Sequence, residues 1–305
     1  MKKYFKYILF VFLLVVVLIF SCNKKDFNEP KSDTIIEGQT NILVDETLLP
    51  IIEDQLAVFE NSYNTKITLL PQSEKESILS LTNSKADIVV LSRKLNKQEL
   101  TIFKQKKIKP KTTAFAIDAI TFIKNKKSND TLIAIEEIID FMKGDKNSIK
   151  GLVFDNPNSS TARYLCELAG ISVLPQEGVF SFETNEDVIN YIAKNEGMVG
   201  VVGLNWLYQP KSEMQKNVDK VAIMSVKNGN SKDYVYPSQQ NVASRKYPLA
   251  RVLNIVNCQG YEGLGMGFAS FIAGEKGQRI ILKSGLAPIR EPSRNIRITN
   301  KLETK

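Results

Sequence analysis

Short apolar strands and amphipathic helices alternate along most of this chain of 305 residues, and this alternation restricts the possible folds more than any other feature. The segment 87–91 is apolar after its first residue, as expected for a strand in a parallel sheet covered on both faces. By contrast, the apolar residues of 48–61 recur at helical spacing. Regular alternation of this kind predicts an α/β fold with largely parallel sheets.

The remaining elements follow from the same patterns of apolar residues. We expect strands at 41–44, 66–70, 87–91, 113–124, 151–154, 198–204 and 251–256, and helices at 48–61, 74–82, 95–104, 135–143, 188–194 and 267–282, with one more helix that ends at Gly170. Gly263 to Gly267 lacks the spacing of a phosphate-binding loop and predicts a flexible lead into the last helix. The length favours two α/β lobes, with 113–124 and 247–256 as the segments that cross between them.

The N-terminus has the layout of a secretory signal. Lysines at 2, 3 and 6 precede an apolar run, and Cys22 follows Ser21 where the chain becomes polar. Bacterial lipoprotein processing acylates a cysteine at this position and cuts in front of it. We therefore predict a signal peptide at 1–21, a lipidated Cys22, and a flexible tether to residue 38 that holds the folded part outside the cytoplasm. The alternative is an uncleaved anchor, since 4–20 is nearly long enough to span a bilayer.

Composition excludes several classes of function. Without the three lysines of the signal, 38 basic residues stand against 33 acidic ones, too small an excess for nucleic-acid binding. The chain has no histidine, which excludes histidine-based catalytic triads and histidine metal sites, and we expect no cofactor and no metal. Cys166 and Cys258 could form a disulfide in an oxidising compartment, or Cys166 could be a buried apolar residue of its helix.

Three successive hydroxyl residues, Ser159, Ser160 and Thr161, follow the strand 151–154 and begin a helix. One of them can cap the helix by accepting an amide hydrogen bond. Together with the free amides and the helix dipole, they could instead form an anion site, to which Arg163 would add a charged donor. The local sequence leaves both interpretations open.

A second turn of the same kind, Asp45-Glu46-Thr47, connects the first strand to the first helix. Ser73, and the pair Ser92-Arg93, occupy the corresponding loops of the first half of the chain. Ligands of open α/β sheets bind at the carboxyl ends of the strands, so such turns from two lobes can face each other across a cleft.

The order of the segments ADIVVLSRKLNKQEL, AIDAITFIKNK, VFDNPNSSTARYL, GMVGVVGLNWL, YPLARVLNIV and GMGFASFIAGEKGQRIILKSGLAPI resembles the PstS-like phosphate-binding proteins, and most of all their lipid-anchored branch in Bacteroidetes. These are extracytoplasmic receptors of phosphate ABC importers. The resemblance implies a periplasmic-binding-protein fold of type II, with two α/β lobes joined by a double crossover hinge. Lobe 1 would comprise 39–116 and 245–292 and lobe 2 117–244, followed by a tail at 293–305.

The resemblance also assigns residues. Ser159 and Thr161 match the Ser-Gly-Thr loop of the family, and Ser160 replaces its glycine. Thr47 matches the hydroxyl of the first loop, and Ser73 is a looser match to the second.

Two departures from the family pattern concern charge. Asp155 stands where many members have an arginine, and Ser92-Arg93 stands where they have an aspartate that accepts the proton of the phosphate. Our hypothesis is that Arg93 and Arg163 supply the positive charge, while Asp45 or Glu46 becomes the acceptor that prefers a protonated oxyanion.

The function that the resemblance implies is that of a monomeric, lipid-anchored receptor, not an enzyme, which captures phosphate or a related oxyanion for an ABC permease. One alternative is the same fold with another anion as its ligand, or acting as a sensor. Another is a secreted phosphoester hydrolase with Ser159 or Ser160 as nucleophile, although no base or metal site to activate the serine is evident in the sequence.

Overall fold

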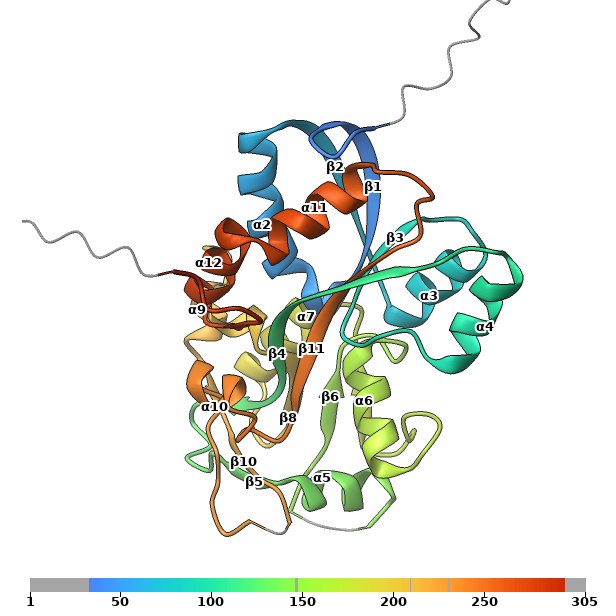
Figure 1. Ribbon diagram of the computed structural model, residues 1–305. Coiled ribbons are helices and arrows are strands. Elements are labelled where there is room, and N and C mark those ends of the chain that lie inside the picture. The colour runs from blue at the N-terminus through green and yellow to red at the C-terminus, as the bar shows by residue number, and fades with distance from the viewer. Residues whose placement is uncertain (1–32, 146–147, 209, 230, 294–305) are drawn as a thin grey trace, which may run out of the picture.

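The computed structural model describes residues 33–145, 148–208, 210–229 and 231–293. The predicted signal peptide, Cys22, the first part of the tether and the tail from residue 294 lie outside these residues. The described part is an α/β fold of two lobes, one above the other in Figure 1, with β4 and β11 running between them. The prediction of a two-lobed α/β fold is confirmed. The prediction of largely parallel sheets was wrong, because β4 and β11 cross between the lobes antiparallel to their neighbours and make the sheets of the described residues mixed.

The elements have the following bounds. The strands are β1 (Glu37–Asp45), β2 (Asn64–Gln72), β3 (Ile88–Leu91), β4 (Lys111–Asn125), β5 (Leu132–Ala134), β6 (Leu152–Phe154), β7 (Val179–Ser181), β8 (Val199–Gly203), β9 (Val221–Ile223), β10 (Ser225–Lys227), β11 (Ala250–Asn257) and β12 (Ala287–Pro288). The helices are the 3₁₀ turn η1 (Glu46–Leu48), α2 (Leu49–Ser62), α3 (Glu74–Thr82), α4 (Lys97–Gln105), α5 (Ile135–Met142), α6 (Ser160–Ala169), α7 (Asn185–Lys194), α8 (Asn205–Tyr208), α9 (Gln215–Val218), α10 (Gln239–Ala243), α11 (Leu264–Ala273) and α12 (Glu275–Lys283).

The sheet of the first lobe has the strand order β2-β1-β3-β11-β4, and helices cover both of its faces. β1 is parallel to β2 and β3, whereas β11 is antiparallel to β3 and β4. Successive residues of a strand point to opposite faces. Ile42 and Val44 of β1 accordingly join the core formed with α2 and α11, and Leu43 joins a separate core with α3 and α4.

The sheet of the second lobe continues from β4 through β8 and β6 to β7. β6 is parallel to both β7 and β8, and all three of its residues are buried. Val153 packs with α7 on one face, while Leu152 and Phe154 pack with α5 and α6 on the other. The carboxyl end of β6 leads through a short loop to the N-terminus of α6, and both ends face the first lobe (Figure 1).

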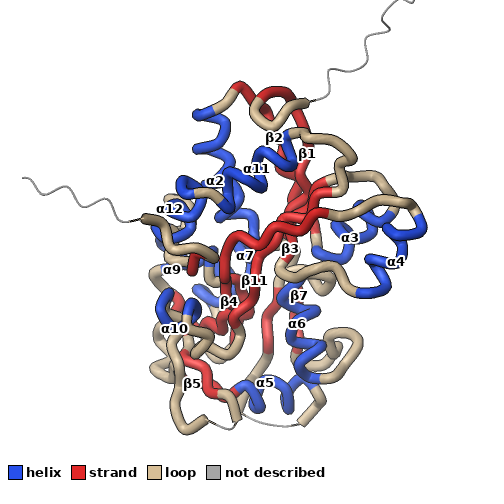
Figure 2. Tube along the Cα trace, viewed as in Figure 1, coloured by secondary structure: helices blue, strands red, loops and turns tan. Residues whose placement is uncertain are grey.

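β4 belongs to both sheets. Its first half pairs with β11, and its second half pairs with β8 and β9. Figure 2 shows β4 and β11 side by side where the two lobes meet. The prediction that these two segments cross between the lobes is confirmed.

Most predicted elements are present, with bounds that shift by a few residues. α3 has the predicted bounds, and α6 ends at Gly170, which adopts the left-handed conformation (φ 70°) as its C-cap. The short elements β5, β7, β9, β10, β12, α8, α9 and α10 were not predicted from the sequence.

The predictions for the last helix were wrong in two respects. Gly274 divides the helix into α11 and α12. Gly265 and Gly267 lie inside α11 and do not form a flexible lead. A Cβ atom at Gly267 would lie 1.8 Å from the carbonyl oxygen of Ile35, so glycine is needed there for the close approach of another backbone segment.

That segment belongs to the folded part, which begins earlier than the predicted tether allows. The buried carboxylate of Asp33 accepts hydrogen bonds from the hydroxyl of Tyr261 and from the amide of Leu264. β1 then begins at Glu37. Among the described helices, none has the length and apolar character needed to cross a bilayer.

Candidate functional site

The two turns singled out in the sequence lie together between the lobes. Asp45, Glu46 and Thr47 follow β1, and Asp155 follows β6. The hydroxyl of Thr47 donates a hydrogen bond to Oδ2 of Asp155 over 3.0 Å, and both residues are buried. The predicted arrangement, with two turns facing each other across the lobes, is therefore present.

Three hydroxyls converge on Asp155, and we call Thr47, Ser159 and Thr161 the hydroxyl cradle. Ser159 and Thr161 donate to Oδ1 of Asp155 over 2.5 and 2.7 Å, and their own oxygens are 2.8 Å apart. Ser159 also caps α6 by accepting the amide hydrogen of Ala162. Capping and oxyanion binding, the two interpretations of this turn, are thus compatible in one residue.

The acceptor in the cradle is a fully buried carboxylate. Burial raises the pKa of Asp155, and the hydrogen bonds from Ser159, Thr161 and Thr47 oppose that rise by stabilising the ionised form. A fourth donor, Nδ2 of Asn185, lies 3.0 Å from Oδ2. The site therefore already binds one oxyanion, the carboxylate of Asp155, through neutral donors that come from both lobes.

Asp45 and Glu46 place two more carboxyl groups beside the cradle. Burial raises the pKa of Asp45 to about 7, with Glu74 adding to the rise and Arg251 opposing it. Its Oδ1 accepts the amide hydrogen of Thr47, and its buried Oδ2 accepts no hydrogen bond from any described residue. Burial raises the pKa of Glu46 to about 8, and Asp155 adds to the rise.

Glu46 also connects the lobes. Its carboxylate accepts hydrogen bonds from the backbone amide of Asn185 and, over 2.7 Å, from Nδ2 of the same residue. Trp206 makes a further link by donating from its indole nitrogen to the carbonyl oxygen of Thr47 over 3.0 Å. The turn after β1 is thus bound to the second lobe at several points.

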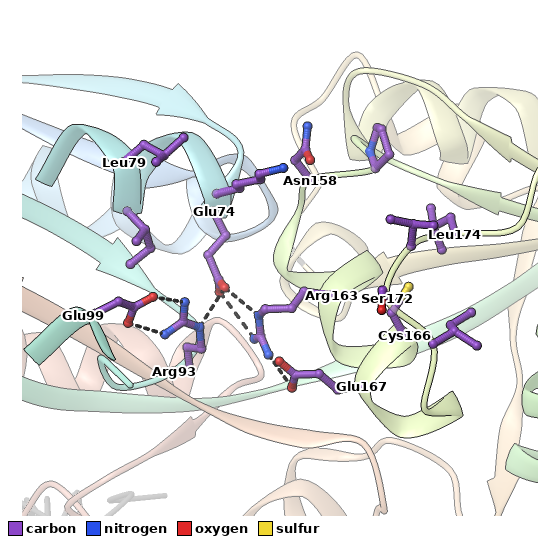
Figure 3. A pocket seen from close by; sticks show the side chains of 15 residues that line it. Glu74, Leu79, Arg93, Glu99, Asn158, Arg163, Cys166, Glu167, Ser172 and Leu174 are labelled. Atoms are coloured by element: carbon purple, nitrogen blue, oxygen red, sulfur yellow. Dashed lines mark hydrogen bonds and ion pairs between the residues drawn. The ribbon is translucent and has the colours of Figure 1, made fainter. Parts of the chain in front are cut away.

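Arg93 and Arg163, predicted to supply positive charge, meet at a common carboxylate (Figure 3). Glu74, at the start of α3, accepts hydrogen bonds from Nε of Arg93 over 2.9 Å and from Nε of Arg163 over 2.6 Å. Glu99 binds Arg93 through both of its oxygens, and Glu167 binds Arg163. Both guanidinium groups are therefore neutralised by carboxylates, and the side chain of Glu74 is only 2% exposed.

This arginine cluster, Glu74, Arg93, Glu99 and Arg163, perturbs the pKa values of its members. Burial would raise the pKa of Glu99, but the hydrogen bonds from Arg93 and from the amide of Asn96 outweigh it and lower the pKa. The hydrogen bonds with Glu99 likewise raise the pKa of Arg93. A cavity of about 550 Å³ adjoins the cluster, with α3 on one side and α6 on the other.

Ser73 and Ser92 lie in the first lobe near this cluster. Ser73 caps α3 and forms a reciprocal capping box with Glu76. The hydroxyl of Ser92 donates to Glu74 over 3.2 Å. Ser92 thus adjoins the arginine cluster through Glu74, whereas the hydroxyl of Ser73 is engaged in the cap.

Glu74→Gln should lower the free energy of unfolding by about 2 kcal/mol, because hydrogen bonds to charged groups contribute roughly 1.5–3 kcal/mol. Urea denaturation of both proteins measures the difference. Glu167→Gln is the matched control, since it alters an exposed partner of Arg163 and should cost less than about 1 kcal/mol. Equal effects of the two substitutions would contradict the bridging role of Glu74.

Two residues of the site, Arg251 and Asn185, were not predicted from the sequence. Arg251 lies on β11 and is buried, with Nη2 2.9 Å from Oδ2 of Asp118 and Nη1 donating to the hydroxyl of Ser160 over 2.9 Å. A single arginine inside an apolar strand pattern was the signal that could have identified it. Asn185 was missed because α7 begins three residues before the predicted helix.

Within the described residues, no group of three or more acidic or cysteine side chains is arranged to hold a metal ion. Cys166 and Cys258 are both buried and not joined to each other. Of the two interpretations of Cys166, the buried apolar residue is the one observed.

Comparison with known proteins gives consistent matches. Residues 30–276 match the family model of the PBP superfamily domain. The chain is 25% identical, over 304 residues, to the phosphate-binding protein PstS of Borreliella burgdorferi, with 93% of this chain and 99% of that protein covered.

Two solved structures share the fold. The first is a putative phosphate ABC transporter substrate-binding protein with bound phosphate from Clostridium perfringens, with 19% identity and a TM-score of 0.70 over 83% of this chain and 100% of the other. The second is an ABC-type phosphate transport receptor from Vibrio cholerae, with 18% identity and a TM-score of 0.61 over 82% of this chain and 100% of the other.

Proposed function

The chain belongs to the PBP superfamily, and from this premise we propose that it is an extracytoplasmic receptor that captures inorganic phosphate, or a closely related oxyanion, between its lobes. The observation that carries the proposal is the hydroxyl cradle, in which donors from both lobes converge on an oxyanion, the carboxylate of Asp155. The relative at 25% identity is named a phosphate-binding protein, and one structural neighbour has phosphate bound.

The receptor would bind and release its ligand without chemical change and deliver it to an ABC permease. We propose lobe 1 as 39–116 and 245–292 and lobe 2 as 117–244, because β4 and β11 then form the hinge between them. Bilobal receptors of this kind close on a ligand by hinge motion. Glu46, Thr47, Ser159 and Thr161 would meet the ligand, with Ser73, Ser92, Arg93, Ser160 and Arg163 in supporting positions around them.

We further propose that the receptor is monomeric and tethered to a membrane through an acylated Cys22. Cys22 lies only a short polar segment before Asp33, where the described fold begins. Metabolic labelling with a tritiated fatty acid tests the anchor. The wild-type protein should take up label and sediment with membranes, and Cys22→Ser should do neither.

We expect the carboxyls of Asp45 and Glu46 to favour an anion that still carries a proton over one that carries none. At pH 8 the carboxyls of Asp45 and Glu46, with pKa values of about 7 and 8, are ionised to a large extent and repel an anion that carries no proton. Phosphate retains a proton to share with a carboxylate, and sulfate does not. At pH 5.5 both carboxyls are neutral and can donate to either anion.

Calorimetric titration of the full-length protein in detergent, freed of ligand by unfolding and refolding, tests this selection. We expect phosphate to bind at least tenfold more tightly than sulfate at pH 8, and the ratio of the two affinities to shrink at pH 5.5.

Thr161→Val should weaken phosphate binding about tenfold, the scale of one hydrogen bond to a charged group. Thr101→Val, on the exposed side of α4, is the matched control and should change nothing. Equal affinity for both anions at pH 8 would overturn the selection, and no binding of phosphate would overturn the proposed ligand.

A further inference from the structure

The carboxylate of Asp155 uses the donors that an oxyanion ligand would need. A serine or threonine hydroxyl has one proton to donate. The hydroxyls of Thr47 and Thr161 donate theirs to Asp155 over 3.0 and 2.7 Å, and the oxygen of Ser159 lies 2.5 Å from the same carboxylate. None of these protons is then available to a second acceptor.

The negative charge of Asp155 also opposes the binding of an anionic ligand. Asp155 is buried, its two neighbours Asp45 and Glu46 are also carboxyls, and Asp155 raises the pKa of both. The positive charge in its field comes from Arg251, which is itself paired with Asp118. An incoming dianion would therefore meet a carboxylate at short range in a medium that screens charge poorly.

The position of Asp155 in the chain makes it a contact between the lobes. It follows β6 in the second lobe, whereas Thr47 follows β1 in the first. The hydrogen bond between them, and that from Asn185 to Glu46, join the two turns directly. The same carboxylate thus both fills the cradle and holds the lobes together.

We propose, on the basis of the function proposed above, that Asp155 is an internal competitor of the ligand. Its carboxylate occupies the hydroxyl cradle when the lobes are together, and the oxyanion must displace it to bind. Asp155 therefore sets the affinity of the receptor below the value that the cradle alone would give. It is a specificity-determining residue that disfavours anions with a high charge and no proton.

The test is phosphate titration of the full-length wild-type protein and of Asp155→Asn in detergent at pH 8. Asparagine keeps the shape of the side chain, removes its charge and adds an amide donor. Calorimetry measures affinity, and the emission of Trp206, the only tryptophan of the chain, reports on the contact between the lobes. Asp155→Ser is a second variant, for use if Asp155→Asn fails to fold. Asp187→Asn makes the same change of charge at an exposed position of α7 and is the matched control.

We expect Asp155→Asn to bind phosphate at least tenfold more tightly than the wild type, and Asp187→Asn to bind like the wild type. Tight binding by the variant together with none by the wild type would support the internal competitor while overturning phosphate capture by the natural chain. Binding by the wild type that is equal to, or tighter than, that of the variant would overturn the internal competitor and leave the proposed function intact. Absence of phosphate binding in every protein would overturn both.

Discussion

Arg251→Met should lower the free energy of unfolding by about 3–5 kcal/mol, the range measured when one partner of a buried ion pair is removed. Arg251 and Asp118 face each other on β11 and β4, and their side chains are 2% and 0% exposed. Without the guanidinium group, Asp118 would keep a buried charge with no counter-charge, and its Oδ1 already lacks a partner among the described residues. The hydroxyl of Ser160, beside the cradle, would lose its donor as well.

Urea denaturation followed by circular dichroism measures this loss, and two variants make the result specific. Arg279→Met breaks an exposed pair with Glu275 on one helix face and should cost less than about 1 kcal/mol. Replacing Arg251 and Asp118 together, by methionine and leucine, should recover much of the loss because no buried charge remains. A cost below about 1 kcal/mol for Arg251→Met alone would show that the pair contributes little to the hinge strands.

The local parts of the fold could be predicted from the sequence because short-range physics determines them. The capping residue Ser159, the C-cap Gly170 and the apolar strand that became β3 follow from the chemistry of a few neighbouring residues. The break at Gly274 was missed because the apolar pattern continues across it. The reason for glycine at Gly267, a distant backbone segment that lies against it, was not visible in the local pattern.

The site was predictable in its positions but not in its pairings. That the turns after β1 and β6 meet follows from the rule for open α/β sheets. Which side chain fills the cradle depends on tertiary geometry. The departures of the chain from the family pattern led to the hypothesis that Arg93 and Arg163 carry the positive charge. In the structure Arg93 and Arg163 are bound by Glu74, and their role toward a ligand stays a prediction.

The ion pair between Arg251 and Asp118 is a feature that the sequence alone could not predict. Asp118 is 133 residues away from Arg251, and the register of β11 against β4 brings the two together. A pattern of apolar residues fixes which face of a strand is buried, but not which polar residue of another strand lies opposite. The ion pair therefore became evident only when the pairing of the two strands was known.

The free energy of unfolding should fall by about 3 kcal/mol or more between pH 5 and pH 8. Burial raises the pKa of Asp45 from 3.8 to about 7 and that of Glu46 from 4.5 to about 8. Between each pair of values the folded protein holds a proton that the unfolded chain releases. By linkage, stability then falls as pH rises through this window, at about 1.4 kcal/mol per pH unit for each fully coupled group. Burial raises the pKa values of Asp118 and Asp155 as well, so they add to the trend.

Urea denaturation at pH 5, 6, 7 and 8, followed by the emission of Trp206, measures this dependence. Asp45→Asn should flatten it, mainly between pH 5 and 7, and should make the protein more stable than the wild type at pH 8. Asparagine can still accept the amide hydrogen of Thr47 through its oxygen, so the turn itself keeps its bond. Glu46→Gln should flatten the profile up to pH 8, in keeping with the higher pKa of Glu46. An unchanged slope in both variants would mean that these carboxyls titrate in the folded protein as they do in the unfolded chain, and the selection of a protonated ligand by Asp45 and Glu46 would then lose its basis.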